Sequence, residues 1–95
     1  MSERDYSKRP LMREWCASHN EEMLFADGFD AALVGVAERC GQPTLAVYDV
    51  ELCINILMEE GHCTDREEAL EHIEFNVIGA WMGENTPLFL RRVEM

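Results

Sequence analysis

The sequence predicts an α+β fold in which a three-stranded, mainly antiparallel sheet packs against a helical hairpin, with a further helix at the N-terminus. Three observations support this prediction. Two short apolar stretches, 31–38 and 44–48, lie on either side of a loop that contains glycine and proline, as in a β-hairpin. Two segments with helical periodicity follow one another over 49–83. A third short apolar stretch supplies a last strand, predicted over 88–93.

The length of 95 residues predicts a single domain with a modest core. A chain of this size buries roughly 60–65% of the surface that its unfolded form exposes. The stability of such a fold is marginal unless a partner or a second copy adds to the buried surface.

The N-terminal part combines an arm and a helical segment. Residues 1–9 are polar and mixed in charge, and we expect a mobile arm there. The segment 10–26 is predicted to be helical, and its apolar stripe has members spaced three, one and three residues apart: Met12, Trp15, Cys16 and His19. We expect Trp15 to anchor this helix. Asn20 leaves two alternatives, because it can cap a second short turn or lie within one helix that continues to Ala26.

The β-hairpin is predicted over 31–48. Its first strand, 31–38, is continuously small and apolar, which favours a strand buried on both faces or nearly so. Gly35 within this strand indicates a β-bulge or the close approach of another element. The loop 39–43 connects it to the second strand, 44–48.

The first helix of the predicted hairpin, which spans 49–83 as a whole, has a signal at each end. The carboxylate of Asp49 can accept hydrogen bonds from the first free backbone N–H groups. The apolar residues that follow have the spacing of an amphipathic helix: Val50, Cys53, Ile54, Leu57 and Met58. Gly61 is predicted to end this helix, because glycine readily adopts the left-handed conformation found after helix C-termini.

The second helix begins with Thr64 and Glu67, which form a Thr-x-x-Glu capping box. From Phe75 to Gly83 the sequence is apolar on most sides, which predicts the most buried helical segment of the fold, ended by Gly83. Asn76 lies among these apolar residues, so we expect its amide to join the helix to a neighbouring loop or strand.

The direction of the last strand follows from the predicted helical hairpin. Two antiparallel helices would return the chain to the end of the sheet that it left. The last strand is therefore expected to pair with the second strand in the antiparallel sense. Pairing beside the first strand, in parallel, is the alternative.

The charge of the chain is strongly negative. Nineteen acidic residues against eight basic ones give a net charge of −11. Between residues 20 and 90 there are fifteen acidic residues and only two arginines, a net charge of −13. Such a field repels nucleic acids and anionic membranes and attracts basic partners, although an acidic surface also serves solubility alone. No apolar run approaches the length of a membrane span. We therefore expect no direct binding to nucleic acid or membrane.

Three stretches resemble a group of short uncharacterised proteins found in phage and prophage genomes. The stretches are ADGFDAALVGV from Ala26, VYDVELCINILMEEG from Val47 and EEALEHIEFNVIGAWMGENTP from Glu67. In that group the corresponding patterns are GFDxAIIG, VYDxDKxIEIL and EFNxxxAyxGExTP. The resemblance covers about two-thirds of the chain and not the N-terminal helix. It implies a phage or prophage accessory protein that acts in the bacterial cytoplasm, and it assigns no catalytic residues.

Residues with catalytic or metal-binding potential are scattered. Cys16 and His19 are one helical turn apart and His62 adjoins Cys63, so the four could bind zinc only if the N-terminal helix packed over that turn. Cys40 lies beside an arginine but has no predicted base or orienting group. We therefore predict a non-enzymatic protein without metal or cofactor. The polar N-terminus predicts reduced thiols and a cytoplasmic location.

An acidic ridge is the predicted partner-binding site. Its glutamates recur on one helix face or follow that helix: Glu67, Glu68, Glu71, Glu74 and Glu84. Such a row can be a solvated face, or it can present negative charge to a basic surface. The leading hypothesis is an acidic phage-type protein that binds a basic surface of a host protein, for example as an inhibitor of a nucleic-acid-handling or defence complex in the manner of an anti-CRISPR. The alternative is a structural or assembly protein acting as a homo-oligomer, such as a homodimer, through Trp81 and Met82 if these are exposed.

Overall fold

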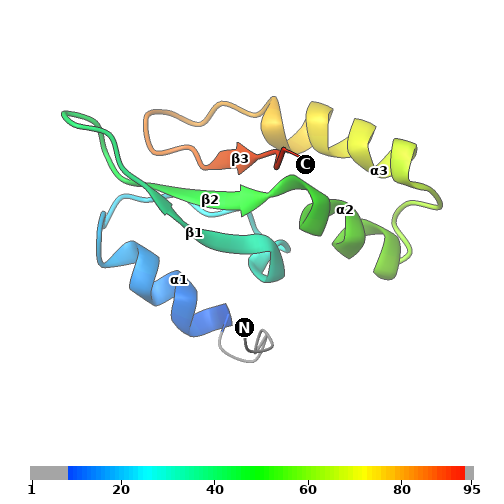
Figure 1. Ribbon diagram of the computed structural model, residues 1–95, viewed down its shortest axis with the longest axis horizontal. Coiled ribbons are helices and arrows are strands. Elements are labelled where there is room, and N and C mark those ends of the chain that lie inside the picture. The colour runs from blue at the N-terminus through cyan, green and yellow to red at the C-terminus, as the bar shows by residue number, and fades with distance from the viewer. Residues whose placement is uncertain (1–8, 94–95) are drawn as a thin grey trace.

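The computed structural model describes residues 9–93, with side chains from residue 13 onward, and its fold is α+β (Figure 1). All but the last residue of the arm predicted over 1–9 lies outside the described residues. The elements in chain order are helix α1 (Arg9–Ala17), the 3₁₀ turn η2 (Asp30–Ala32), strands β1 (Leu33–Ala37) and β2 (Leu45–Asp49), helices α2 (Val50–Glu59) and α3 (Arg66–Ile73), the π-helical turn η3 (Glu74–Ile78) and strand β3 (Leu88–Leu90).

The three strands form one mixed sheet in the order β1-β2-β3. β1 and β2 pair antiparallel, as the predicted hairpin requires, whereas β3 pairs in parallel with β2, with Val47 opposite Leu88. The expected antiparallel direction of the last strand is therefore wrong. The reason lies in segment 79–87, which carries the chain back along the sheet after α3, so that β3 enters at the same end as β2 (Figure 1).

The local signals in the β-hairpin and in α2 are confirmed. The register of β1 against β2 shifts between Leu33 and Gly35, which is the bulge predicted at that glycine. Asp49 caps α2, since its Oδ1 accepts a hydrogen bond from the Leu52 N–H at 3.2 Å. Gly61 follows α2 with a φ of 77°. However, only Leu33 of β1 is fully buried, so the strand is half-buried over most of its length.

The N-terminal helix is shorter than predicted. It ends at Ala17, and turns and extended chain replace the expected helix over 18–26. Asn20 forms a short turn, because its Oδ1 accepts a hydrogen bond from the Glu22 N–H at 3.0 Å. Its Nδ2 donates to the carbonyl oxygen of Thr44 at 2.9 Å. Asn20 therefore joins this segment to the β-hairpin.

The residue that anchors α1 is not the expected tryptophan. Trp15 is 54% exposed and contacts His19, with the ring centroids 4.5 Å apart and the rings tilted by 57°. Its neighbour Cys16 is fully buried and belongs to the main core. The expectation that Trp15 anchors the helix is wrong, because the helix turns the smaller side chain of Cys16 towards the sheet.

The cap of α3 lies one residue later than predicted. Asp65, not Thr64, is the N-cap, and its Oδ1 accepts a hydrogen bond from the Glu68 N–H at 2.8 Å. Glu68 in turn accepts a hydrogen bond from the Thr64 N–H through its Oε1, also at 2.8 Å. The arrangement is like a capping box, except that the Glu68 carboxylate reaches back to the N–H of Thr64, which precedes the N-cap, and not to that of Asp65.

The second half of the predicted helix is not a buried helix. The α-helical ladder ends at Ile73, the turn η3 follows, and no helix continues to Gly83. Phe75 is 78% exposed and Trp81 76% exposed, so the expectation of a buried segment over 75–83 is wrong. Ile73 is the last fully buried side chain of this helix, and beyond it the chain leaves the core.

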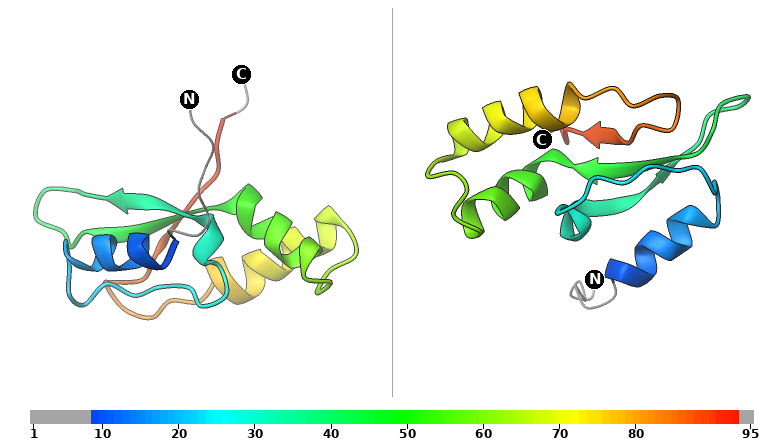
Figure 2. Two further views of the ribbon diagram at one scale, coloured as in Figure 1. Left: turned by 90° about the horizontal axis from the view of Figure 1, so that it is seen from below. Right: turned by 180° about the vertical axis from the view of Figure 1, so that it is seen from behind.

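The core lies between one face of the sheet and the elements that cover it. Seen from below, α1, the chain that follows it and α3 lie on the same side of the β1–β2 hairpin (Figure 2). Tyr48 is fully buried on this face, where its hydroxyl accepts a hydrogen bond from the Ala26 N–H at 2.9 Å and its ring stacks on that of Phe89. Helices α2 and α3 pack on each other beyond the end of β2 rather than across the strands (Figure 1).

Candidate protein-binding surface

The five glutamates predicted to bind a partner have different surroundings. Glu68 holds the start of α3 through Thr64, and Glu74 pairs with Arg91 at 3.0 Å, so both have structural contacts within the chain. Glu67 and Glu71 are exposed on α3, and Glu84 is exposed in the loop after η3. The predicted ridge is therefore reduced to two free carboxylates on the helix, with a third some distance along the chain.

A different feature dominates this part of the surface. Phe75, Trp81 and Met82 lie within eight residues of one another, and their exposed fractions are 78%, 76% and 70%. Isolated exposed apolar residues are common, but large ones close together in the chain indicate an interaction site. The condition under which Trp81 and Met82 would form an association surface is thus met.

The exposure of Phe75 follows from the local backbone. Residues Glu74–Ile78 form a π-helical turn, a rare conformation that occurs most often at functional sites. Gly79 ends the turn, and a Cβ at this position would lie 3.0 Å from the carbonyl oxygen of Glu74. The Asn76 side chain donates to the carbonyl oxygen of His72 at 3.2 Å, so this exposed amide stabilises the turn rather than joining the helix to a loop or strand as predicted.

The loop that carries Trp81 and Met82 is fixed by Thr86. The Thr86 hydroxyl donates a hydrogen bond to the carbonyl oxygen of Gly83 at 2.7 Å and accepts one from the Met82 N–H at 2.8 Å. Leu24 N–H donates to the carbonyl oxygen of Asn85 at 3.2 Å, which ties the loop to the segment after α1. The two exposed side chains therefore project from a positioned loop.

An apolar groove runs beside Trp81 on the uncovered side of the sheet. It consists of two adjoining recesses of about 410 Å³ and about 310 Å³, which share four lining residues: Gln42, Leu45, Glu84 and Leu88. Trp81 lines the larger recess and Glu38 the smaller one. Glu38 and Glu84 thus place carboxylates at an apolar groove. Of the five glutamates predicted to bind a partner, Glu84 is the one that lines it.

A third recess, of about 280 Å³, lies on the other side of the same loop. Phe25, Phe29 and Phe89 form much of its wall, and Met82 and Asn76 also line it. Several lining residues belong to the stretches that resemble the phage proteins: Ala26, Asp27, Phe29, Asn76, Val77, Thr86 and Pro87. The loop 79–87 therefore separates two apolar recesses and has an exposed side chain at each, Met82 here and Trp81 at the groove.

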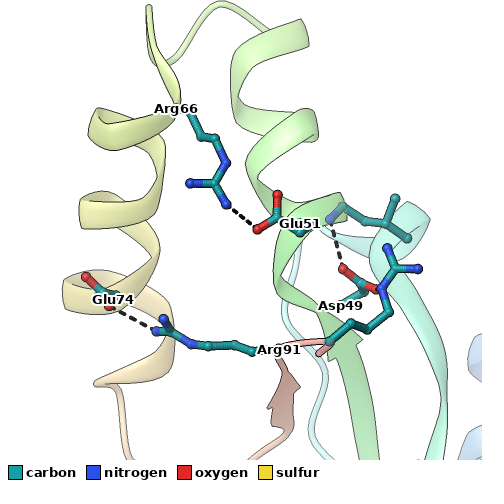
Figure 3. A network of polar contacts seen from close by, with 7 residues as sticks. Asp49, Glu51, Arg66, Glu74 and Arg91 are labelled. Atoms are coloured by element: carbon teal, nitrogen blue, oxygen red, sulfur yellow. Dashed lines mark hydrogen bonds and ion pairs between the residues drawn. The ribbon is translucent and has the colours of Figure 1, made fainter. Parts of the chain in front are cut away.

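A polar recess lies between α2, α3 and the chain after β3 (Figure 3). Arg66 pairs with Glu51, Arg91 with Glu74 at 3.0 Å, and Arg92 with Asp49 at 2.7 Å. Each pair joins parts of the chain that are distant in sequence. Arg91 and Arg92 thus pair with carboxylates of η3 and β2 and not with Glu84, which is nearer in the chain.

The predicted zinc ligands are not brought together. Among residues 13–93, no group of three or more histidine, cysteine, aspartate or glutamate side chains is placed to hold a metal ion. Burial raises the pKa of Cys53 to about 12, with the Asp49 carboxylate as a second cause, and burial also raises the pKa of Cys16. Burial and the nearby carboxylates of Glu68 and Asp65 raise the pKa of the Cys63 thiol. These three thiols therefore stay protonated near neutral pH. Cys40 is the exposed cysteine of the four.

In the part of the chain that the structure describes, no helix has both the length and the apolar character needed to cross a bilayer. Comparisons of this chain with protein-family models, with curated proteins and with solved structures find no match.

Sequence reasoning missed the exposed apolar residues because it placed them in a helix. A signal was present: Gly79 interrupts the apolar stripe four residues before the predicted end, and glycine inside a helix is unfavourable by about 1 kcal/mol relative to alanine. Neither the groove nor the arginine cluster has a local signature, because their residues come from separate parts of the chain.

Proposed function

We propose that this protein is a non-enzymatic binding protein that occupies a basic and partly apolar surface of another protein. The observation that carries the proposal is the exposure of Phe75, Trp81 and Met82, each by 70% or more, with Trp81 lining an apolar groove. Keeping three large apolar side chains in water gives up the burial energy that they could contribute to the fold, about 1.5–3 kcal/mol each. A partner that covers them recovers that energy.

The charge of the chain selects the kind of partner. With a net charge of −11, the protein repels acidic surfaces and attracts basic ones. Glu84 and Glu38 line the groove, and Glu71 precedes Phe75 by one helical turn. Apolar anchors within a rim of charge are the usual anatomy of a protein interface, with the anchors giving affinity and the rim giving orientation and association rate.

The resemblance to phage and prophage proteins supplies the proposed setting. In that setting the partner is a bacterial host protein and the site of action is the cytoplasm. A host protein that handles nucleic acid offers the basic surface that this charge requires, and occupation of that surface inhibits it. Inhibition of such a complex, including a defence complex, is the sharpest form of the proposal.

The test is capture of host proteins by the immobilised chain, with two matched pairs of variants. Trp81→Ser is compared with Trp15→Ser, which alters the other tryptophan, 54% exposed on α1. Glu71→Lys with Glu84→Lys is compared with Glu59→Lys and Glu60→Lys, which changes the net charge equally at the end of α2. The proposal expects a basic protein that is captured at about 50 mM salt and weakened at about 500 mM.

Only the first member of each pair should reduce capture. Trp81→Ser should weaken it at least tenfold, the usual effect of removing an aromatic anchor. Equal losses in both members of a pair would show that general surface properties, not this site, cause the capture. Full capture by both Trp81→Ser and the Glu71/Glu84 variant would overturn the proposal.

A second candidate function, self-assembly, is favoured by the uncovered face of the sheet. On this face Val47 is half-buried and Leu88 and Leu90 are 45% and 43% exposed. Two copies of net charge −11 repel each other, so self-association should strengthen as salt rises, which is opposite to binding of a basic partner. Light scattering at tens of micromolar protein, at low and high salt, distinguishes the two functions, and a monomer throughout excludes assembly in that range.

A further inference from the structure

The arginine-lined recess between α2, α3 and the chain after β3 is separate from the proposed docking surface (Figure 3). Its volume is about 580 Å³. Arg66, Arg91 and Arg92 line it, and these are three of the five arginines whose side chains the structure describes. Three of these five arginines thus line one recess, and each of them also pairs with a carboxylate.

Each of the three guanidinium groups has N–H donors that its ion pair does not use. One nitrogen of each group faces its carboxylate: Arg66 faces Glu51, Arg91 faces Glu74 and Arg92 faces Asp49. A guanidinium carries five N–H donors, so each group retains donors for another acceptor. Their side chains are 57%, 56% and 60% exposed, and an anion can therefore reach them from solvent.

Stability alone gives little reason for this arrangement. Exposed ion pairs contribute little to the folding free energy, and two of these three pairs join side chains that are both about half exposed. The third pair is different, since the Asp49 side chain is only 4% exposed. The Arg66 and Arg91 pairs thus hold two guanidinium groups in place around the recess at small benefit to the fold.

We propose that this recess binds a small organic phosphate. Arg66 and Arg91 both lie between α2 and α3 (Figure 3), and guanidinium groups bind the oxygens of a phosphate monoester through paired N–H donors. The recess is larger than a phosphate group alone requires, and Val50, Leu70 and Val93 give it apolar walls for the organic part. Each of the three guanidinium groups pairs with a carboxylate, so a bound phosphate competes with Glu51, Glu74 and Asp49 for the donors.

That competition provides a distinctive test. Glu51→Gln and Glu74→Gln remove the carboxylates that compete for Arg66 and Arg91 without removing a guanidinium. Each variant should bind phosphate about threefold more tightly than the unaltered chain. If these residues only brace the fold, neither variant gains affinity.

The measurement is a titration of the full chain, followed by backbone amide chemical shifts, at constant ionic strength with chloride as the balancing anion. The probes are inorganic phosphate, adenosine monophosphate and adenosine. We expect saturable shifts around Glu51, Leu70 and Val93, with adenosine monophosphate at least tenfold tighter than inorganic phosphate and no saturation by adenosine. The paired arginines Arg66→Gln and Arg91→Gln should each weaken binding at least fivefold, whereas Arg39→Gln, in the exposed hairpin loop, should not.

Several results would overturn the proposal. One is the absence of saturable shifts with either phosphate probe up to about 20 mM, and another is adenosine binding as tightly as its monophosphate. Equal weakening by Arg39→Gln would show that only the general charge matters. Because folding is monitored in the same spectra, loss of binding through unfolding is distinguished from loss of the site, and the two glutamine variants of the glutamates test the site without deleting an arginine.

Discussion

In the region formed by β1, β2 and α2, several large apolar side chains are fully buried, whereas in segment 74–88 several face solvent. Leu33, Tyr48 and Ile54 are at most 1% exposed, while Phe75 and Trp81 are more than 75% exposed. Segment 74–88 is less apolar than β1, β2 and α2, but seven of its fifteen residues are still apolar. The difference shows that hydrophobic residues in this chain serve two purposes, the formation of a small core and the formation of an open surface.

The largest expected effect is a difference in stability between two alanine substitutions that are only two positions apart, one in each region. Ile73→Ala removes a fully buried side chain and should lower the free energy of unfolding by about 2–5 kcal/mol. Phe75→Ala removes a side chain that is 78% exposed and should change it by no more than about 0.5 kcal/mol. Urea denaturation measures both, and a large loss in Phe75→Ala would show that this side chain packs in the fold.

The next prediction concerns how much Asp49 contributes to the free energy of unfolding at the junction of β2 and α2. Asp49 is buried, caps α2 and pairs with Arg92 at 2.7 Å. Asp49→Ala should lower the free energy of unfolding by about 2 kcal/mol, because it removes the cap and leaves the arginine unpaired. Asp49→Asn retains an acceptor for the cap and should cost about half as much.

The exposed cap of α3 provides the control for this prediction. Asp65→Ala removes a cap without a buried ion pair and should cost about 1 kcal/mol. If Asp49→Ala costs no more than Asp65→Ala, the buried pair with Arg92 adds nothing to the junction.

Alkaline pH should weaken the core region specifically. Burial raises the pKa of the Cys53 thiol from 9.0 to about 12, with the Asp49 carboxylate as the second cause. The folded state therefore keeps its proton between pH 9 and 12 while the unfolded state loses it. Below pH 9 the thiol is protonated in both states and the free energy of unfolding keeps its full value. As the pH rises from 9 towards 12, this free energy falls by at most about 1.4 kcal/mol per pH unit.

Thermal unfolding from pH 8 to pH 11 measures this decline. Burial also raises the pKa of Tyr48, which adds to the decline above pH 10. Cys53→Ala should make the decline less steep, even if the variant is less stable at pH 8. An identical slope in the variant would show that Cys53 does not contribute.

The smallest expected effect concerns the segment that faces solvent. In Gly79→Ala the new Cβ would lie 3.0 Å from the carbonyl oxygen of Glu74 and 3.2 Å from that of Phe75. Relief of this contact requires the π turn to shift, at a cost of about 1 kcal/mol. Denaturation together with the chemical shifts of Phe75 checks it. If neither the stability nor the shifts change, the turn does not depend on Gly79.

Several local features could be predicted from short stretches of sequence. The cap at Asp49, the end of α2 before Gly61 and the bulge at Gly35 are confirmed. Each depends on the chemistry of one residue and its immediate neighbours, such as a carboxylate beside free N–H groups. The α+β class is also confirmed. It could be predicted because periodicity within a segment indicates the secondary structure of that segment.

The errors arose where distant residues decide the outcome. An apolar helix face after Ile73 was expected to be buried, but no element covers Phe75. The last strand pairs with the expected neighbour but in the opposite direction. Residues 79–83 were predicted to be helical, whereas segment 79–87 carries the chain back along the sheet. Of the five glutamates predicted to bind a partner, only Glu84 lines the groove, while Trp81 and Met82 meet the condition of exposure set for an association surface.

The sequence by itself determined the charge of the chain, its hairpin and the starts of its helices. All of these depend on composition or on interactions within a few residues. The tertiary structure alone decided the parallel pairing of β3, the exposure of Trp81 and the arrangement of three arginines around one recess. These features depend on which apolar faces find a covering element, and a 95-residue chain has too few elements to cover all of them.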